Sequence, residues 1–318
     1  MNCRFIKKLA VIVWISFLIF ASSCAYGSDI LIVTSENTGP YLAVIEKLLH
    51  VTQPVGNLHL DTIPISSLSQ KRSELSGGEY QLVVTIGVRA TEEITALGFS
   101  TPVLSTLIPS QAYEDIARRQ GLSDYHHFSA VFLDQPLSRR FELLRAALPG
   151  STQVGVVLGP VTQPQLGSLI STARNYGLTI DAEKIFQPDE LITALQKVSS
   201  ETAVFFALPD PMVVSRDTAQ SLLLTTYRAN IPVIAFSHAY VRAGALAAVY
   251  STPEQIGQQT GEAILRLNQS GSWNLPKPQY PKYFSVSVNS QVARSLGLEI
   301  ESEQVLVEKL KSSMEREP

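Results

Sequence analysis

The chain has 318 residues, 45% of them hydrophobic, with 25 basic and 28 acidic side chains. A formal charge of −3 excludes the strongly cationic surface that binds nucleic acid or anionic lipid through charge alone. The two cysteines, Cys3 and Cys24, both lie near the N-terminus, so we expect the rest of the chain to fold around a hydrophobic core without an internal disulfide.

The first 27 residues have the pattern of a secretory signal. Arg4, Lys7 and Lys8 precede an apolar stretch over residues 9–20, and small residues follow it. This stretch is too short to span a bilayer, which predicts cleavage and export. Loss of the three signal cations would take the formal charge from −3 to −6. About 290 residues would remain, enough for two compact lobes or one large domain.

Two forms of processing compete within the signal. Cleavage after Ala25 or Gly27 satisfies the small-residue rule. The segment ASSC, which ends at Cys24, instead resembles a bacterial lipobox with Ala21 in place of the usual Leu. We therefore expect a periplasmic protein, with Cys24 as the lipidation candidate and a lipid anchor as its only link to the membrane.

From residue 29 onward, short β-branched runs alternate with amphipathic stretches. The runs read, in chain order, DILIVTS, YQLVVTIG, TPVLSTLI, QVGVVLGP, TAVFFALP, IPVIAFS and LAAVY. Continuous apolar runs are typical of strands buried on both faces. The alternation predicts α/β lobes with parallel sheets and right-handed crossovers, one set of strands before about residue 128 and one after it.

One intervening helix is well marked. Over residues 137–148, Leu137, Phe141, Leu144 and Leu148 recur at helical spacing, and Pro149-Gly150 ends the pattern.

Parallel sheets bind ligands beyond the carboxyl ends of their strands. Those ends are predicted in six segments rich in hydroxyl, Gly and Pro residues: 34–41, 85–91, 105–110, 158–164, 207–215 and 236–244. Such segments leave backbone N–H groups and helix starts free to hold a polar solute. The alternative for any single segment is an ordinary turn, which every parallel strand needs.

Catalytic motifs are scarce. The sequence has no G-x-S-x-G, G-x-G-x-x-G, C-x-x-C or H-E-x-x-H pattern. His126 and His127 adjoin Asp124, but neighbouring side chains of an extended segment point to opposite faces, which favours surface or hinge histidines over metal ligands. His238 follows a strand end, where it would contact ligand or be packed and hydrogen-bonded. We expect no metal, no cofactor and no enzymatic activity.

A resemblance covers nearly the whole chain after the signal. The segment FSAVFLDQPLSRRFELLRAALPGSTQVGVVLGP (128–160) resembles the lobe-crossing region of ABC-transporter substrate-binding proteins related to tryptophan- and tyrosine-binding components. FALPDPMVVS, IPVIAFSHAYVRAGALAAVY, QIGQQTGEAI and YFSVSVNSQVARSLGLEI resemble further blocks of that family in the same order.

The resemblance implies a type I periplasmic binding-protein fold, with two doubly wound parallel-sheet lobes joined by three crossover strands. Lobe 1 would comprise residues 28–128 and about 252–280, and lobe 2 residues 129–251 and about 281–318. Residues near Ser129, Tyr250 and Tyr283 would form the hinge.

IPVIAF would be a strand of lobe 2, with the loop Ser237 to Gly244 over the cleft, and ALAAVY would return to the hinge. A helix would then begin with Thr252 as N-cap, Pro253 at the first position and Gln255 closing a capping box, and would pack on lobe 1. KYFSVSVN would cross again to lobe 2.

The resemblance weakens where ligand is held. The family's IGTPAA is IGVRAT here, so Val88 replaces a hydroxyl donor and Arg89 replaces proline. Arg89 could pair with a carboxylate or phosphate in the cleft, or it could be an exposed arginine on a first helical turn. The ligand-binding residues we expect are Thr38, Tyr41, Gly87, Arg89, Thr106, Asp210, Ser237, His238 and Tyr250.

These inferences predict a monomeric solute-binding protein that closes on a small polar or amino-acid-like ligand, with an ABC permease of the inner membrane as partner. The alternative is a ligand sensor or envelope-assembly component with the same fold and no role in transport. A periplasmic hydrolase has least support, because no nucleophile and base can be paired from the sequence.

Overall fold

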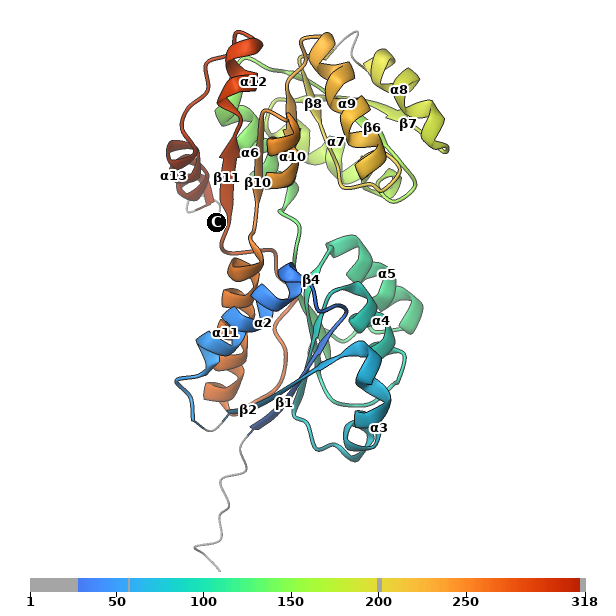
Figure 1. Cartoon of the computed structure of the whole chain (residues 1–318), viewed down its shortest axis with the longest axis vertical. Coiled ribbons are helices and arrows are strands. Elements are labelled where there is room, and N and C mark those ends of the chain that lie inside the picture. The colour runs from blue at the N-terminus through green and yellow to red at the C-terminus, as the bar shows by residue number, and fades with distance from the viewer. Residues whose placement is uncertain (1–27, 57, 199–201, 315–318) are drawn as a thin grey trace, which may run out of the picture.

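The computed structural model describes residues 28–56, 58–198 and 202–314. The signal segment with Cys24 lies outside the described residues, so its cleavage and lipidation stay predictions. The described elements form two lobes stacked along the long axis of the molecule (Figure 1). No described helix is both long and apolar enough to cross a lipid bilayer.

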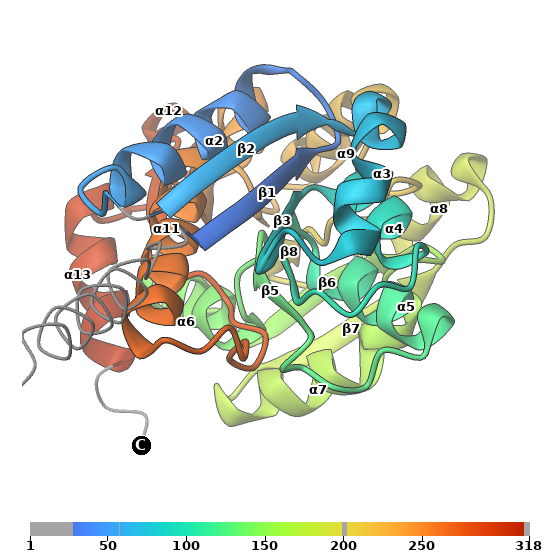
Figure 2. The ribbon, with the colours of Figure 1, turned by 90° about the horizontal axis from the view of Figure 1, so that it is seen from below.

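The first lobe is built on a parallel sheet of five strands in the order β2-β1-β3-β4-β5. The strands are β1 (Ser28–Thr34), β2 (Leu58–Pro64), β3 (Leu82–Ile86), β4 (Val103–Ile108) and β5 (Phe128–Phe132). One face packs on α3 (Leu68–Gly77), α4 (Val88–Thr95) and α5 (Ser110–Gln120), with the short η1 (Ile65–Ser67). The other face packs on α2 (Gly39–Thr52) and on α11 (Pro253–Ser270), which returns from far along the chain (Figure 2).

The second lobe has a six-stranded sheet in the order β11-β10-β9-β8-β6-β7. Its strands are β6 (Gln153–Leu158), β7 (Thr179–Lys184), β8 (Val204–Phe206), β9 (Val233–Ala235), β10 (Ala247–Tyr250) and β11 (Ser285–Val288). Only β11 runs antiparallel to its neighbour among these described strands.

Helices cover both faces of the second sheet. On one face lie α6 (Leu137–Ala147), α7 (Leu166–Asn175), α12 (Ser290–Ser295) and α13 (Glu303–Met314), with the short η2 (Gln163–Gln165) before α7. On the other lie α8 (Leu191–Val198), α9 (Arg216–Arg228) and α10 (His238–Ala243), with η3 (Pro188–Glu190) before α8.

The chain passes between the lobes three times (Figure 1). We call these passages the hinge segments: residues 133–136 after β5, residues 251–252 after β10, and residues 271–284 between α11 and β11. Strand β5 pairs with β4, so the first sheet extends to residue 132 and the chain leaves it four residues later than we expected.

Two local predictions are confirmed. Helix α6 begins at Leu137 and buries Phe141 and Leu144. Helix α11 has Thr252 as N-cap and Gln255 in a reciprocal capping box, with Pro at its start.

The packing of α11 on the first lobe is also confirmed, and it depends on a glycine. A Cβ built on Gly257 would lie 2.5 Å from the carbonyl oxygen of Val44 in α2, a separation too short for any side chain.

Three segments differ from the sequence-based expectation. The pattern did not predict β2 and β7, because both are edge strands with half-exposed, partly polar residues. The segment expected as a loop from Ser237 to Gly244 is instead the short helix α10, which Ser237 caps and Gly244 ends.

Candidate functional site

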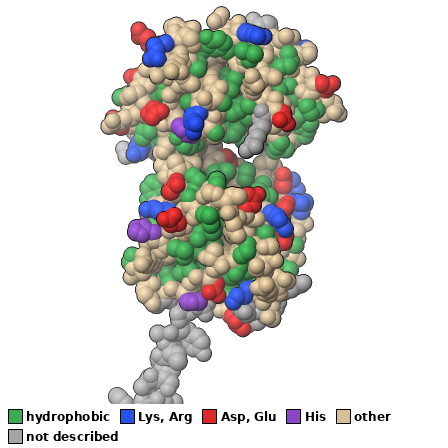
Figure 3. Space-filling model, in the orientation of Figure 1, with side chains coloured by type: hydrophobic (Ala, Val, Ile, Leu, Met, Phe, Trp, Pro, Cys, Tyr) green, Lys and Arg blue, Asp and Glu red, His purple; other side chains and the backbone are tan. Residues whose placement is uncertain are grey.

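The carboxyl ends of the strands in the two sheets face each other. The chain enters the other lobe directly after β5 and again directly after β10, so each of these strands ends at the edge nearest the opposite lobe. Since their neighbours are parallel to them, all six strand ends that we predicted to hold ligand share these two edges with them. The surface is hollowed between the lobes, and we call this hollow the cleft (Figure 3).

Gly87 starts the helix that forms part of the first wall of the cleft. Its φ of +91° is a conformation that side chains rarely adopt, and a Cβ there would lie 2.7 Å from Cε1 of Tyr41. The N–H of Gly87 donates to the carbonyl of Thr106 at 2.9 Å. The N–H of Ala90 donates to the hydroxyl of Ser35 at 2.8 Å. The turn is therefore fixed by backbone and side-chain bonds that only glycine permits.

Two backbone N–H groups at this helix start have no hydrogen-bond acceptor among the described residues. Within the described ranges, the N–H groups of Val88 and Arg89 donate to no protein acceptor. A helix start has a partial positive charge, so these groups can hold an anionic or carbonyl oxygen.

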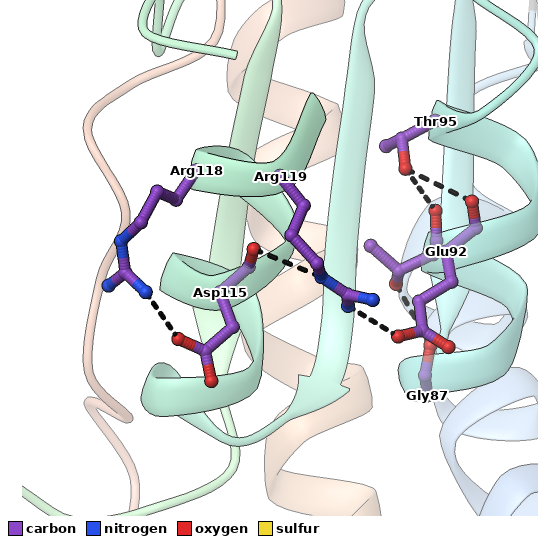
Figure 4. A network of polar contacts seen from close by, with 7 residues as sticks. Gly87, Glu92, Thr95, Asp115, Arg118 and Arg119 are labelled. Carbon is purple, nitrogen blue, oxygen red and sulfur yellow. Dashed lines mark hydrogen bonds and ion pairs between the residues drawn. The ribbon is translucent and has the colours of Figure 1, made fainter. Parts of the chain in front are cut away.

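Helix α4 is held in place by its neighbour α5 (Figure 4). The guanidinium of Arg119 donates to Oε1 of Glu92 at 2.7 Å and to the carbonyl of Asp115 at 3.3 Å. Arg118 donates to the carboxylate of Asp115 at 2.9 Å. These pairs are exposed and each adds at most about 1 kcal/mol of stability. The pair Arg119–Glu92 links α5 to α4, whereas the bonds to Asp115 lie within α5.

The guanidinium of Arg89 is paired with a carboxylate on its own helix. Its Nε lies 2.8 Å from Oε1 of Glu93, one turn further along the same helix, and its side chain is 65% exposed. This matches the alternative of an exposed arginine on the first helical turn.

The other expected residues of the first wall have different surroundings. Thr106 is fully buried, and its hydroxyl lies 2.8 Å from that of Thr260 in α11, so it ties the sheet to α11. Tyr41 is half-buried beside Gly87, and burial together with the charge of Glu36 raises the pKa of its hydroxyl. Thr38 is exposed and donates to Glu36 at 3.3 Å. Tyr41 and Thr38 are thus the members of this group that remain accessible.

Asp210 is a structural carboxylate of the second wall. It is 1% exposed, and its Oδ2 accepts from the N–H groups of Val161 and Thr162 at 3.0 and 2.9 Å and from the Thr162 hydroxyl at 3.0 Å. Its Oδ1 accepts from the N–H of Met212 at 3.0 Å. A Cβ on Gly159 would lie 2.2 Å from Oδ1, so glycine makes room for the carboxylate. With four donors from its own lobe, Asp210 joins two strand-end loops.

Ser237, His238 and Tyr250 lie at the end of the second sheet nearest the hinge. Ser237 caps α10 by accepting from the N–H of Tyr240 at 3.3 Å. Nδ1 of His238 and the hydroxyl of Tyr250 each lie 2.9 Å from the hydroxyl of Ser287 on β11. We did not predict Ser287 as a partner of these residues, because β11 pairs with β10 only after the whole of α11.

The Ser287–His238 pair lacks the third member of a catalytic triad. Ser287 is buried and also bonded to Tyr250, and among the described residues no carboxylate contacts the second ring nitrogen of His238. A buried serine without this third group does not match a catalytic triad.

The three hinge segments are bonded to one another. Nε2 of Gln135 donates to the hydroxyl of Ser251 at 2.8 Å, and this hydroxyl donates to the carbonyl of Tyr283 at 2.5 Å. Arg139, in the first turn of α6, donates to Oε1 of Gln135 and, at 2.8 Å, to the carbonyl of Pro281. Sequence reasoning missed this network, although Gln135 and Arg139 are polar residues directly beside a predicted crossing.

Asp134 marks the first-lobe end of the first hinge segment. Its two carboxylate oxygens accept from the N–H and the hydroxyl of Ser110, each at 2.6 Å, and so cap helix α5. Asp134 is thus fixed to the first lobe, whereas Gln135 next to it is bonded to the other hinge segments. These two neighbouring residues are thus bonded to different parts of the molecule.

The histidine pair is occupied by local bonds. Nδ1 of His127 lies 2.9 Å from Oδ2 of Asp124, and Nδ1 of His126 lies 3.2 Å from the carbonyl of Leu275. In the part of the chain that the structure describes, no three His, Cys, Asp or Glu side chains come together as a metal site would need. Pockets at the C-terminal ends of α11 and α2 contain none of the expected ligand-binding residues.

Comparison with known proteins relates the chain to transport. The family described as ABC transporter substrate binding protein matches residues 64–312. No curated protein matches the sequence.

Several solved structures are similar to this chain in fold. An ABC domain in complex with L-Trp from Streptococcus pneumonia is 15% identical, with a TM-score of 0.60 over 89% of this chain and 98% of its own. The ligand-free, open structure of a substrate binding protein with adhesive properties from Clostridium difficile is 17% identical, with a TM-score of 0.71 over 87% and 97%. A periplasmic ribose ABC transporter structure from Conexibacter woesei is 13% identical, with a TM-score of 0.54 over 87% and 97%. The likeness confirms the predicted type I periplasmic binding-protein fold.

Proposed function

Because the chain belongs to the family of ABC transporter substrate-binding proteins, we propose that it is the solute-binding component of an ABC-type uptake system. It closes its two lobes on a small polar or amino-acid-like molecule, without chemistry, and the closed form is recognised by a permease of the inner membrane. Closure is a hinge motion of two preformed bodies about the hinge segments.

One observation supports this function above the others: two sheets turn their carboxyl edges toward a common cleft, and three hinge segments join the described parts of the two lobes. Binding sites at such edges use backbone donors and helix starts, and the free N–H groups of Val88 and Arg89 are donors of this kind. Tyr41 and Thr38 beside them add hydroxyl groups at the same wall.

The ligand class follows from these groups and from the relatives. Backbone N–H donors and hydroxyls suit a solute with oxygen acceptors, which both amino acids and sugars provide. The structural relatives include one bound to L-Trp and one described as a ribose transporter. A small polar solute is the class that all of these features share.

Localisation follows from the same proposal. A substrate-binding protein of this family acts outside the cytoplasm, as a monomer that diffuses or is tethered near its permease. Lipidation of Cys24 would provide the tether. In that case Cys24→Ser releases the protein into the soluble periplasmic fraction, whereas unchanged fractionation with a mature N-terminus at Tyr26 or Ser28 contradicts the anchor.

A thermal-shift screen of the protein without residues 1–27 tests the function. The screen covers amino acids, aromatic acids, sugars and small anions. A binder at one hundred times its dissociation constant adds about 2.7 kcal/mol to the free energy of unfolding, which the method resolves. A higher melting temperature with one chemical series supports a solute-binding role. An unchanged melting temperature with every compound favours a sensor or assembly component.

A further inference from the structure

A buried arginine lies at the second wall of the cleft. Arg140, in the first turn of α6, is 4% exposed, and its guanidinium carbon lies 4.2 Å from the centre of the Phe206 ring. Its Nη2 donates to the carbonyl of Ala207, the residue that directly follows β8. Because β8 ends at the edge of the sheet that faces the other lobe, the guanidinium lies at the cleft side of this lobe.

The charge of Arg140 has no protein counter-ion in contact. Among the described residues no carboxylate forms an ion pair with it, and its Nε is buried without a hydrogen-bond partner. Asp134 is the acidic residue whose charge it feels, but both oxygens of Asp134 already accept hydrogen bonds from Ser110. Burial lowers the pKa of Arg140 to about 9, so the side chain is still cationic at neutral pH.

The position of this arginine is unfavourable for the stability of the lobe alone. A cation in the first turn of a helix opposes the helix dipole, and burial removes its hydration. One bond to a backbone carbonyl and contact with an aromatic ring offset only part of this cost. A ligand that brings a negative charge to the guanidinium would offset the rest.

Its neighbour Arg139 shows what a structural arginine looks like in the same turn. Arg139 bonds to Gln135 and to the carbonyl of Pro281 and lies over the ring of Phe284, so it joins hinge segments. Each of the two arginines has a buried Nε without a partner, but Arg140 donates to the carbonyl of Ala207 at the carboxyl edge of the sheet and not to a hinge segment.

We propose that Arg140 is the anion-recognising residue of the second lobe, which takes a carboxylate or phosphate group of the ligand when the lobes close. The inference rests on the proposed solute-binding function and deepens it, because it names the charge of the ligand and the residue that selects it. The guanidinium fork matches two oxygens of a planar or tetrahedral anion. The free N–H groups of Val88 and Arg89 are donors on the opposite wall.

Calorimetric titrations test this assignment with probes in pairs. L-tryptophan is compared with tryptamine, which lacks the carboxylate, and D-ribose 5-phosphate is compared with D-ribose. We call the member that carries the carboxylate or phosphate the charged probe. We expect wild-type protein to bind the charged probe of at least one pair and to bind the partner that lacks this anionic group at least about 30-fold more weakly. The pair that responds distinguishes a carboxylate from a phosphate.

Three variants test whether Arg140 is the residue that causes the preference for the charged probe. Arg140→Gln keeps a donor for the carbonyl of Ala207 but removes the charge, and we expect it to abolish the preference for the charged probe. Arg140→Lys keeps the charge without the fork and should retain part of the preference. Arg145→Gln is the matched control: Arg145 lies on the same helix and donates to the carbonyls of Pro149 and Ser151 at 3.1 and 3.3 Å, away from the cleft. Its affinities should equal those of the wild type.

Several outcomes would overturn the assignment. Equal affinity of wild type and Arg140→Gln for the charged probe shows that Arg140 only supports Ala207. If Arg89→Gln alone loses affinity for the charged probe, Arg89 is the residue that recognises the anion. Wild-type protein that binds the probes without an anionic group equally well contradicts the inference but leaves the proposed function standing. Protein that no solute stabilises contradicts the proposed function itself.

A second measurement reads Arg140 directly, even if Arg140→Gln fails to fold. In wild-type protein labelled with ¹⁵N-arginine, acetate and phosphate should shift the Nε–Hε resonance of Arg140 in a saturable manner. A resonance that does not respond to either anion would also overturn the assignment.

Discussion

The side-chain amide of Gln135 donates to the hydroxyl of Ser251 at 2.8 Å, across 116 positions of sequence. The same hydroxyl donates to the carbonyl of Tyr283, so one serine joins all three hinge segments. The lobes are therefore connected by a bonded core rather than by three independent linkers. Asp134 is fixed to the first lobe on one side of this core.

Removal of the central hydroxyl should weaken the hinge. Ser251→Ala leaves the buried amide of Gln135 and the carbonyl of Tyr283 without a partner, which should lower the free energy of unfolding by about 1–3 kcal/mol. Urea denaturation measures the change. Ser168→Ala removes an exposed hydroxyl bonded only to the carbonyl of Gln165 and should change stability by less than about 0.5 kcal/mol. Equal effects of the two variants would contradict a bonded hinge.

Gly87 should tolerate no side chain. In Gly87→Ala the new methyl group would lie 2.7 Å from Tyr41 and 2.8 Å from the hydroxyl of Ser35, in addition to the strain of a φ of +91°. We expect a loss of at least about 2 kcal/mol in thermal unfolding. Gly121→Ala has a φ of +67° but open space around the new Cβ, so it should cost only about 1 kcal/mol. A smaller loss at Gly87 than at Gly121 would show that this helix start adapts.

Asp210 should act on stability and not on affinity. Asp210→Asn replaces an acceptor oxygen with an N–H donor against the donors of Val161, Thr162 and Met212, which should cost about 2–4 kcal/mol in chemical denaturation. Asp115→Asn disrupts an exposed pair with Arg118 and should cost less than about 1 kcal/mol. If folded Asp210→Asn loses affinity for a ligand that the wild type binds, Asp210 contacts that ligand after all.

Glu262 should contribute to stability in acid. Burial acts to raise its pKa, but the Tyr283 hydroxyl at 2.6 Å, the Gln258 amide at 2.8 Å, and the charges of Lys282 and Arg266 outweigh burial and lower it. The unfolded chain therefore binds the proton more readily. The contribution to stability is complete well above the ordinary glutamate pKa of 4.5 and is lost as the pH falls through that value to the lower folded one.

Denaturation between pH 3 and pH 7 checks this effect. The free energy of unfolding should fall more steeply with acid in the wild type than in Glu262→Gln. Glu46→Gln removes an exposed carboxylate from the neighbouring helix α2 and should follow the wild-type curve. Parallel curves for the wild type and Glu262→Gln would contradict the favourable environment of Glu262.

The sequence was informative wherever the signal was local. The buried runs became strands because both faces of the sheets are covered, and the apolar spacing of α6 and the capping box of α11 depend on residues within four positions of one another. We did not predict strands β2 and β7, because edge strands are only half-buried and their buried and exposed residues alternate little. The crossing of the chain after β5 was visible only through the resemblance.

The site was harder to predict, because its side chains are bonded to residues far along the chain. Thr106 is bonded to Thr260 at a separation of 154 positions. Its hydroxyl, which we expected to contact ligand, therefore links the sheet to α11. Asp210 is satisfied by a loop 48 positions away. Arg140 and Arg139 are adjacent, and each is buried with an unpartnered Nε; only their bonding partners, Ala207 for Arg140 and the hinge segments for Arg139, distinguish them.

Closure on a ligand is the central claim, and small-angle X-ray scattering tests it most directly. Once the thermal-shift screen has identified a binder, the radius of gyration is measured for the free protein and for the protein saturated with that compound. Two lobes that swing together about the hinge segments predict a smaller radius in the complex. An unchanged radius with a saturating binder would contradict closure and would mean that the protein binds its solute without bringing its lobes together.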